Sequence, residues 1–204
     1  MNSTPSQNPL YPIFLKLHEL RLLIVGAGEV GYEKLFFILK NSPQANITMV
    51  ATWVNPDIHE LLAKGNFKVQ IIEKSFEPSD IEGHDLVIAA TNFRELNQEI
   101  RQAAKQQDKL VNVADTPDLC DFYLGSIVTR GPLKVAISTN GQSPTFAKRF
   151  RQLLESILPE EVEDLIQNLK LYRDQLEGDF EAKVKQLNEV TAGLLDAPDE
   201  EVKE

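Results

Sequence analysis

Short apolar runs alternate with longer segments of helical spacing over the first 115 residues. The run at 20–25 stops at a glycine, which is typical of a buried strand. Four more strands are predicted at 47–52, 67–72, 85–90 and 110–113. The segments at 29–40, 56–63 and 94–107 carry the pattern of helices. The alternation of strand and helix predicts an α/β fold with a parallel sheet and helices on both faces.

The pattern changes after residue 115. Two β-rich runs at 122–129 and 133–139 flank Arg130-Gly131-Pro132, which predicts an antiparallel pair. Helices are predicted at 145–157, 160–176 and 179–194, with Ser143 as N-cap and Pro144 in the first helical position of the first. We therefore expect three regions: a nucleotide-binding domain at 1–115, a β-rich dimerisation and substrate segment at 116–150, and a helical region with an acidic tail at 151–204.

The net charge of -10 is concentrated at the C-terminal end of the 204 residues. Residues 155–204 hold 15 acidic and 5 basic side chains, which gives -10, whereas the first 154 residues sum to zero. Nucleic acid is therefore not an expected partner, because phosphates need a basic surface.

Compartment and metal content are also constrained by composition. No apolar run approaches the ~20 residues of a membrane span, and the N-terminus lacks the pattern of a signal peptide. A single cysteine, Cys120, fits a reducing compartment. We expect a soluble, cytoplasmic protein. Only three scattered histidines accompany Cys120, so no metal site is predicted.

A glycine motif follows the first predicted strand directly. Gly26-Ala27-Gly28-Glu29-Val30-Gly31 fits G-x-G-x-x-G at the start of a predicted helix. Gly26 permits a tight turn, Gly28 lets a pyrophosphate approach the backbone, and Gly31 lets the helix pack closely on the strand. The anion then lies at the positive end of the helix dipole. The motif predicts a Rossmann-like dinucleotide-binding domain, with Glu29 and Val30 among the cofactor-binding residues.

The acidic residue that normally binds the ribose hydroxyls is missing from the end of the second strand. Thr52 or Asn55 could supply neutral hydrogen bonds there, and Thr52 is our candidate. No arginine is present to bind a 2′-phosphate. The segment therefore favours NAD over NADP without deciding between them.

Polar residues follow the fourth and fifth strands. Thr91 and Asn92 end the fourth strand, where a cofactor would lie, although Asn92 capping an ordinary turn is an equally good interpretation. Asp115 follows the fifth strand at the same edge. A partly desolvated carboxyl group there could exchange protons near neutral pH. The alternative is a turn-forming Asp-x-Pro sequence.

Taken together, the motifs resemble the precorrin-2 dehydrogenase family, the siroheme synthase N-terminal module. The resemblance covers about residues 10–158 in order. It is carried by the glycine motif with Lys34, 89–92, 112–117, 136–144 and Ala147-Lys148-Arg149. This chain has Thr139 and Asn140 where Ser-Gly is commoner in the family, so no role is expected for a serine hydroxyl at 139.

The resemblance implies NAD-dependent oxidation of precorrin-2 to sirohydrochlorin by a homodimer. In several members the same cleft also inserts ferrous iron, so iron is a possible transient partner. The family's catalytic aspartate matches Asp115, and its Ser/Thr-Gly stretch matches 138–143, which makes Asn140, Gly141 and Ser143 substrate-binding candidates. A substrate with eight carboxylates needs cations, and we select Lys148 and Arg149 from the basic residues of the middle segment. Their alternative is a solvated surface or a dimer interface.

A second interpretation is a non-catalytic NAD-sensing module with a partner-binding helical surface. It explains residues 20–113 equally well but gives no reason for Asp115 or for 140–144. It predicts that Asp115→Ala loses no turnover.

Overall fold

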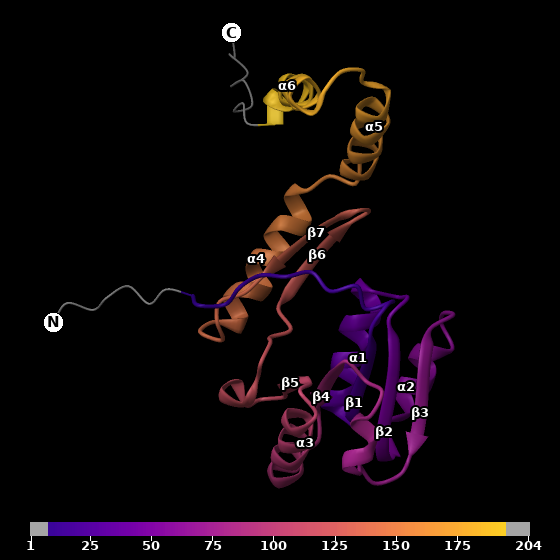
Figure 1. Ribbon diagram of the computed structural model, residues 1–204. Coiled ribbons are helices and arrows are strands. Elements are labelled where there is room, and N and C mark those ends of the chain that lie inside the picture. Colours follow the sequence, from indigo (N-terminus) through magenta and orange to yellow (C-terminus); the bar gives the residue numbers. More distant parts are fainter. Residues whose placement is uncertain (1–7, 195–204) are drawn as a thin grey trace, which may run out of the picture. The chain divides into compact units, whose positions relative to one another are not determined.

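The computed structural model describes residues 8–194 (Figure 1). These residues form two units. Residues up to 127 together with 136–151 make one unit, and residues 128–135 together with those from 152 onward make the other. The first unit carries the candidate site.

A five-stranded parallel sheet forms the centre of the first unit, in the order β3-β2-β1-β4-β5. The strands are β1 (Arg21–Ala27), β2 (Asn46–Val54), β3 (Lys68–Glu73), β4 (Leu86–Ala89) and β5 (Leu110–Val113). The chain moves outward from β1 to β3 and then returns to place β4 on the other side of β1. The strand order therefore reverses between β1 and β4, and ligands of open α/β sheets bind at the carboxyl end of such a point.

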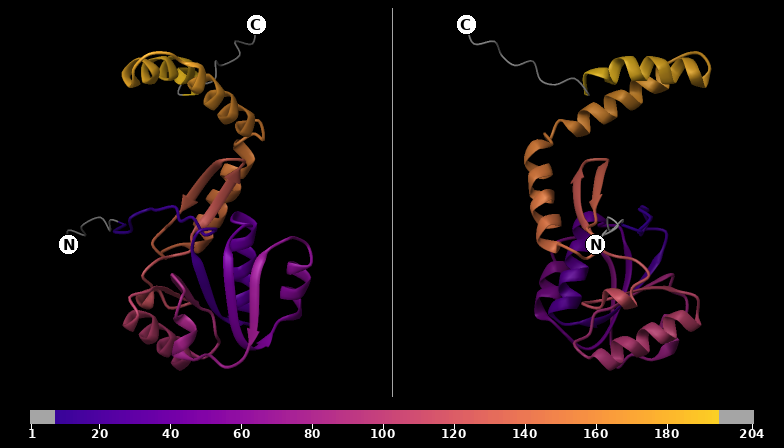
Figure 2. Two further views of the ribbon diagram at one scale, coloured as in Figure 1. Left: turned by 45° about the vertical axis from the view of Figure 1, so that its right-hand side comes forward. Right: turned by 90° about the vertical axis from the view of Figure 1, so that its left-hand side faces the viewer.

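Helices cover both faces of the sheet, as the sequence predicted (Figure 2). They are α1 (Glu29–Asn41), α2 (Pro56–Leu62) and α3 (Arg94–Gln106). Successive residues of β1 point to opposite faces. Leu22 and Ile24 therefore join one core cluster with side chains of α1 and α2, while Leu23 and Val25 join a second cluster with α3. The Rossmann-like fold predicted from the alternation is confirmed.

Strand β2 is longer than predicted and ends in an irregularity that the apolar pattern did not show. The register with β1 shifts between Val25 and Ala27, so that Ala27 pairs with Val54. Asn55 then ends the strand and caps α2, because its side-chain oxygen accepts a hydrogen bond from the Asp57 backbone amide at 3.0 Å.

The predicted hairpin exists, but its first strand starts later than expected. It consists of β6 (Ser126–Arg130) and β7 (Leu133–Ile137). The expected strand start at Phe122 was wrong, because the chain just before it is bonded to β5. Asp121 donates its backbone amide to the Val111 carbonyl at 2.8 Å and accepts from the Val111 amide at 3.0 Å through its carboxylate. A short 3-10 helix, η2 (Pro117–Leu119), precedes this contact.

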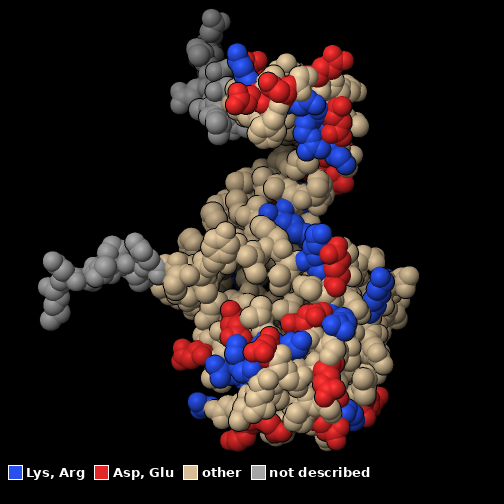
Figure 3. All heavy atoms as spheres, in the orientation of Figure 1, with Lys and Arg blue, Asp and Glu red and all other residues tan. Residues whose placement is uncertain are grey.

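Three helices follow the hairpin: α4 (Pro144–Ile157), α5 (Val162–Gln175) and α6 (Phe180–Thr191), the last extended by the 3-10 helix η3 (Ala192–Leu194). All three were predicted within two or three residues. Neither α5 nor α6 contains a buried residue. Among residues 8–194 no helix is long and apolar enough to cross a membrane. On the face shown in Figure 3, basic side chains lie among acidic ones.

Candidate functional site

The turn between β1 and α1 has room for glycine alone at two of its three motif positions. Gly26 has φ +103°, and a Cβ there would collide with the Ala90 carbonyl oxygen of the neighbouring strand end. A Cβ on Gly31 would collide with the Gly26 carbonyl oxygen. These two glycines bring the turn, the helix and the end of β4 into contact.

Gly28 differs, because a Cβ built there would meet nothing within 4 Å. Its φ of -78° suits any residue, so neither the fold nor the backbone conformation requires glycine. No side chain caps the amides of the following helix turn. The turn is therefore a cradle with open space above it and free N–H donors, as a pyrophosphate needs. The residues present fit a dinucleotide.

The end of β4 is organised by a residue that sequence reasoning missed. Asn97 of α3 is 7% exposed, and its side chain binds Thr91 three times. Its Oδ1 accepts from the Thr91 amide at 3.2 Å and from the Thr91 hydroxyl at 2.7 Å, while its Nδ2 donates to the Thr91 carbonyl at 3.0 Å. The signal was a polar residue on the apolar stripe with Ile100 and Ala104. The Thr91 hydroxyl is thus engaged inside the chain.

Asn92 does not cap the following helix. The N-cap of α3 is Phe93, with no side-chain cap hydrogen bond, so the capping interpretation of Asn92 was wrong. Asn92 is exposed and faces the cavity described below.

Asp115 follows β5 in a left-handed backbone conformation, with φ +56°. This conformation is uncommon for a residue with a side chain and costs ~1–3 kcal/mol unless its surroundings hold it. The hydroxyl of Thr116 donates to the Ala114 carbonyl at 3.3 Å, and the loop that follows is tied back to β5. The expected partial desolvation is not provided by the chain itself, because Asp115 is exposed.

Cys120 helps to hold this loop. Its sulfur accepts from the Val113 amide at 3.2 Å and lies 3.2 Å from the Val113 carbonyl, to which the thiol donates. Burial raises the pKa of the Cys120 thiol. Asn112, which is also buried, donates to the Phe122 carbonyl at 2.8 Å. The loop that carries Asp115 is therefore fixed at both ends, and Cys120 acts as a structural thiol.

These strand ends surround one cavity of about 480 Å³. It is lined by Val30 from the glycine motif, Thr91 and Asn92 after β4, Asp115 after β5, and by Arg94, Asn97, Ala114 and Thr116. The cavity lies at the carboxyl ends of β1, β4 and β5, where the strand order reverses. Four of the predicted site residues, from three separate segments, thus share one space.

Thr52, which we predicted to bind the cofactor, is exposed near the end of β2, two residues before Val54 pairs with Ala27. Asn55, the other residue considered there, makes a hydrogen bond within the chain: its Nδ2 donates to the Glu29 carboxylate at 3.1 Å. Glu29, predicted as a cofactor-binding residue, is thereby connected to the end of β2.

The segment before α4 forms a tight turn. Asn140 and Gly141 have φ +52° and +72°, and the Ser138 hydroxyl accepts from the Asn140 amide at 3.2 Å. Asparagine tolerates this conformation better than most residues, which explains how it can stand where glycine is commoner. Ser143 caps α4 as predicted, because its hydroxyl accepts from the Phe146 amide at 3.2 Å.

Lys148 lines a different cavity from Asp115. This second cavity, of about 420 Å³, lies against α1 and has the cations Lys34, Lys40, Lys148 and Arg151 and the apolar residues Leu17, Phe37, Ile38, Leu124, Ile127 and Pro144 among its lining. Arg149 is exposed and does not line it. Val30 of the first cavity and Lys34 of the second are one helical turn apart, about 6 Å along α1.

Two models of known protein families match this chain. Residues 13–126 match a family model described as "Putative NAD(P)-binding", and residues 130–157 match "Sirohaem biosynthesis protein central". The chain belongs to the siroheme synthase and precorrin-2 dehydrogenase family. The predicted resemblance is therefore confirmed, and the family model supports a nicotinamide dinucleotide as cofactor.

Members of the siroheme synthase family cover most of this chain. "Siroheme synthase" of Pseudoalteromonas atlantica is 38% identical over 86% of the chain and 37% of its own length. The protein of the same name from Methylococcus capsulatus is 43% identical over 72% of the chain and 30% of its own length. The chain thus spans about a third of these relatives. The solved structure "SirC, precorrin-2 dehydrogenase" is 29% identical, with a TM-score of 0.68 and 89% of each chain covered.

No group of three or more His, Cys, Asp and Glu side chains that could hold a metal ion occurs among residues 8–194. Asp115 is the acidic residue among those that line the first cavity, and it belongs to no such group within the described residues.

Proposed function

We propose that this protein oxidises precorrin-2 to sirohydrochlorin with NAD as the hydride acceptor. The observation that carries the proposal is the shared cavity, in which Val30 of the glycine motif and Asp115 line one space. The likeness to SirC, which covers 89% of both chains at 29% identity, supports the substrate. That protein is of similar length, whereas the siroheme synthases are more than twice as long as this chain.

Separate groups of residues bind the two parts of the cofactor that lie at this cavity. The amides at the start of α1 and the open space above Gly28 receive the pyrophosphate. Val30, Thr91 and Asn92 line the space where the nicotinamide would lie, and the Asn97 contacts keep Thr91 in place. A nicotinamide held there would supply the hydride acceptor for oxidation of the macrocycle.

Asp115 accepts the proton that leaves the macrocycle with the hydride. Loss of one hydride and one proton accounts for the two hydrogens removed, so no further redox partner is required. The backbone of Asp115 lies on a loop tied to β5, which places its exposed side chain at the cavity. Bound substrate and cofactor exclude water from the exposed carboxylate, which is the desolvation that the chain itself does not supply.

The second cavity suits the substrate's carboxylates. Its lining combines four cations and six apolar residues with Glu33, and it follows the first cavity along the same helix. A flat, apolar ring with acidic arms matches that combination. Lys148 takes part there, whereas Arg149, Asn140 and Gly141 remain candidate substrate-binding residues at the turn before α4.

We also propose that the protein works as a homodimer. Phe146, Phe150, Leu153 and Ile157 form an exposed apolar stripe along α4 at helical spacing, and the rings of Phe146 and Phe150 stack with centroids 5.8 Å apart. A second copy of the chain would cover this stripe. Sedimentation of the purified protein should give twice the chain mass of 23.0 kDa. A cytoplasmic location and the absence of a nucleic-acid partner remain predictions.

Turnover tests the proposal directly. Precorrin-2 and NAD are added anaerobically to wild type, Asp115→Asn and the control Asp118→Asn, an exposed residue three positions later. We expect sirohydrochlorin from wild type and control, and a loss of at least about a hundredfold in rate for Asp115→Asn with NAD affinity kept. Ferrous ion is added afterwards: if absorbance of the metallated product then forms faster than without protein, the protein also inserts iron.

The second candidate function is NAD sensing without catalysis. It is favoured by α5 and α6, which have no buried residue and so offer their faces to a partner. NAD binding without turnover by wild type would select this function.

A further inference from the structure

The end of β2 lacks the acid that usually recognises the adenosine ribose of NAD. Thr52 and Trp53 are exposed there and Val54 is apolar. In dinucleotide-binding sheets a carboxylate at this place accepts hydrogen bonds from the ribose hydroxyls and disfavours a 2′-phosphate. A different residue of this chain would have to supply it.

Asn55 brings such a carboxylate to the end of β2. It directly follows the strand, is 4% exposed, and has both ends of its amide engaged. The Oδ1 atom caps α2 at the Asp57 amide, 3.0 Å away, and the Nδ2 atom donates to Glu29 Oε1 at 3.1 Å. The cap fixes the orientation of the amide, so the donor is fixed toward Glu29.

Glu29 combines two properties that the missing acid would have. It is in the first turn of α1, next to Gly28, where the pyrophosphate would bind, and its carboxylate is one hydrogen bond from the residue that ends β2. Its second carboxylate oxygen makes no hydrogen bond within residues 8–194, and the side chain is exposed. The carboxylate is therefore held by one oxygen and open to a ligand at the other.

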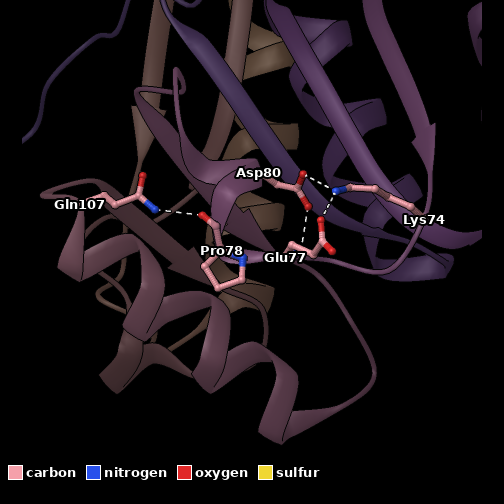
Figure 4. Close-up of polar contacts among 5 residues, drawn as sticks. All are labelled: Lys74, Glu77, Pro78, Asp80 and Gln107. Atoms are coloured by element: carbon pink, nitrogen blue, oxygen red, sulfur yellow. Dashed lines mark hydrogen bonds and ion pairs between the residues drawn. The ribbon is translucent and has the colours of Figure 1, made fainter.

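The basic residue that follows the adjoining strand is already neutralised. Lys74 follows β3 and donates its backbone amide to the Ala51 carbonyl of β2. Its Nζ lies 2.8 Å from both Asp80 and Glu77, as Figure 4 shows, and these hydrogen bonds hold the pKa of Lys74 above its ordinary value. Two carboxylates on one ammonium leave this cluster negative, which disfavours a phosphate.

We propose that Glu29 is the residue that makes this protein select NAD over NADP, with Asn55 as its positioning residue. The Glu29 carboxylate accepts hydrogen bonds from the adenosine ribose and repels a 2′-phosphate. The selectivity has moved from the second strand to the helix that follows the glycine motif. This inference rests on the proposed use of a nicotinamide dinucleotide, and not on the identity of the tetrapyrrole.

Binding of the two nucleotides tests the proposal without turnover. Dissociation constants for NAD and NADP are measured by titration calorimetry with the full chain. We expect wild type to bind NAD more tightly. In Glu29→Gln the ratio of the NADP constant to the NAD constant should fall at least tenfold, which is ~1.4 kcal/mol. The control Glu33→Gln removes the same charge one turn further along α1 and should leave the ratio unchanged.

Asn55→Ser separates positioning from folding. A serine hydroxyl can still cap α2, but it lacks the amide donor to Glu29. The ratio should move in the same direction as in Glu29→Gln while the urea midpoint stays close to wild type.

An unchanged ratio in Glu29→Gln, or equal loss of both nucleotides, would overturn the proposal. A wild type that binds neither nucleotide would instead overturn the proposed function, so the two failures are distinguishable.

Discussion

Replacing Asn97 with alanine should destabilise the first unit and weaken cofactor binding together. The change removes three hydrogen bonds to Thr91, each with a net contribution of ~1 kcal/mol, which sets an upper value of about 3 kcal/mol. Thr91 lines an open cavity, so water can reach the groups that lose a partner. We therefore expect a loss of about 2 kcal/mol in the free energy of unfolding.

Urea unfolding followed by circular dichroism measures this loss, and for a chain of this size it corresponds to roughly 4–8 °C in Tm. NAD affinity should fall severalfold, because the turn at 91–93 loses its fixed position. Gln98→Ala, an exposed neighbour on the same helix, is the control and should differ from wild type by less than about 0.5 kcal/mol. A change that small in Asn97→Ala as well would refute the assignment of Asn97 as the residue that organises the end of β4.

Three further predictions follow from single contacts. Gly28→Val should abolish NAD binding and leave the urea midpoint near wild type, because the new side chain would enter the open space above the turn. Gly31→Val should lower the urea midpoint strongly, because its Cβ would collide with the Gly26 backbone carbonyl. Hydrogen bonds from the Arg21 side chain and backbone lower the pKa of Asp85 below its ordinary 3.8. The ionised Asp85 therefore stabilises the protein above pH ~4, and this contribution is lost as the pH falls through the pKa of Asp85 in the folded protein. Asp85→Asn should flatten the dependence of the urea midpoint on pH below 4, and an unchanged dependence would contradict this. Iodoacetamide, with labelling followed by mass spectrometry, should modify Cys120 slowly at neutral pH and faster as the pH rises past 9, because burial raises the pKa of its thiol. Fast labelling at pH 7 would show that the thiol is not buried as described.

The parallel sheet could be predicted because each of its signals is local. Apolar runs, helical spacing and glycine positions are properties of neighbouring residues, and the alternation of β1 to β5 with α1 to α3 follows from them. The Asn55 cap of α2 and the Ser143 cap of α4 were predictable for the same reason.

The start of β6 could not be predicted, because it depends on contacts across the fold. The Asp121 carboxylate and amide bond to Val111 of β5, ten residues earlier, and the Phe122 carbonyl accepts from Asn112 of β5, so the start of the predicted run is bound to β5. Local pattern gives no information about which strand an Asp will bind.

The candidate site was predicted in part. Strand topology brings Val30, Thr91, Asn92 and Asp115 to one cavity, since the carboxyl ends of parallel strands meet at one edge. The contact of Glu29 with Asn55 depends on the irregular end of β2, and the place of Lys148 in a second cavity depends on how α4 begins relative to α1 within the same unit. Neither of these two contacts can be predicted from the spacing of residues along the sequence.

A crystal structure of the protein with NAD and sirohydrochlorin bound would show whether the two ligands meet at Asp115. We expect the macrocycle to lie between the nicotinamide and the Asp115 carboxylate, with the pyrophosphate over Gly28. A complex in which the Asp115 carboxylate contacts neither ligand, or in which the dinucleotide lies away from the glycine turn, would contradict it.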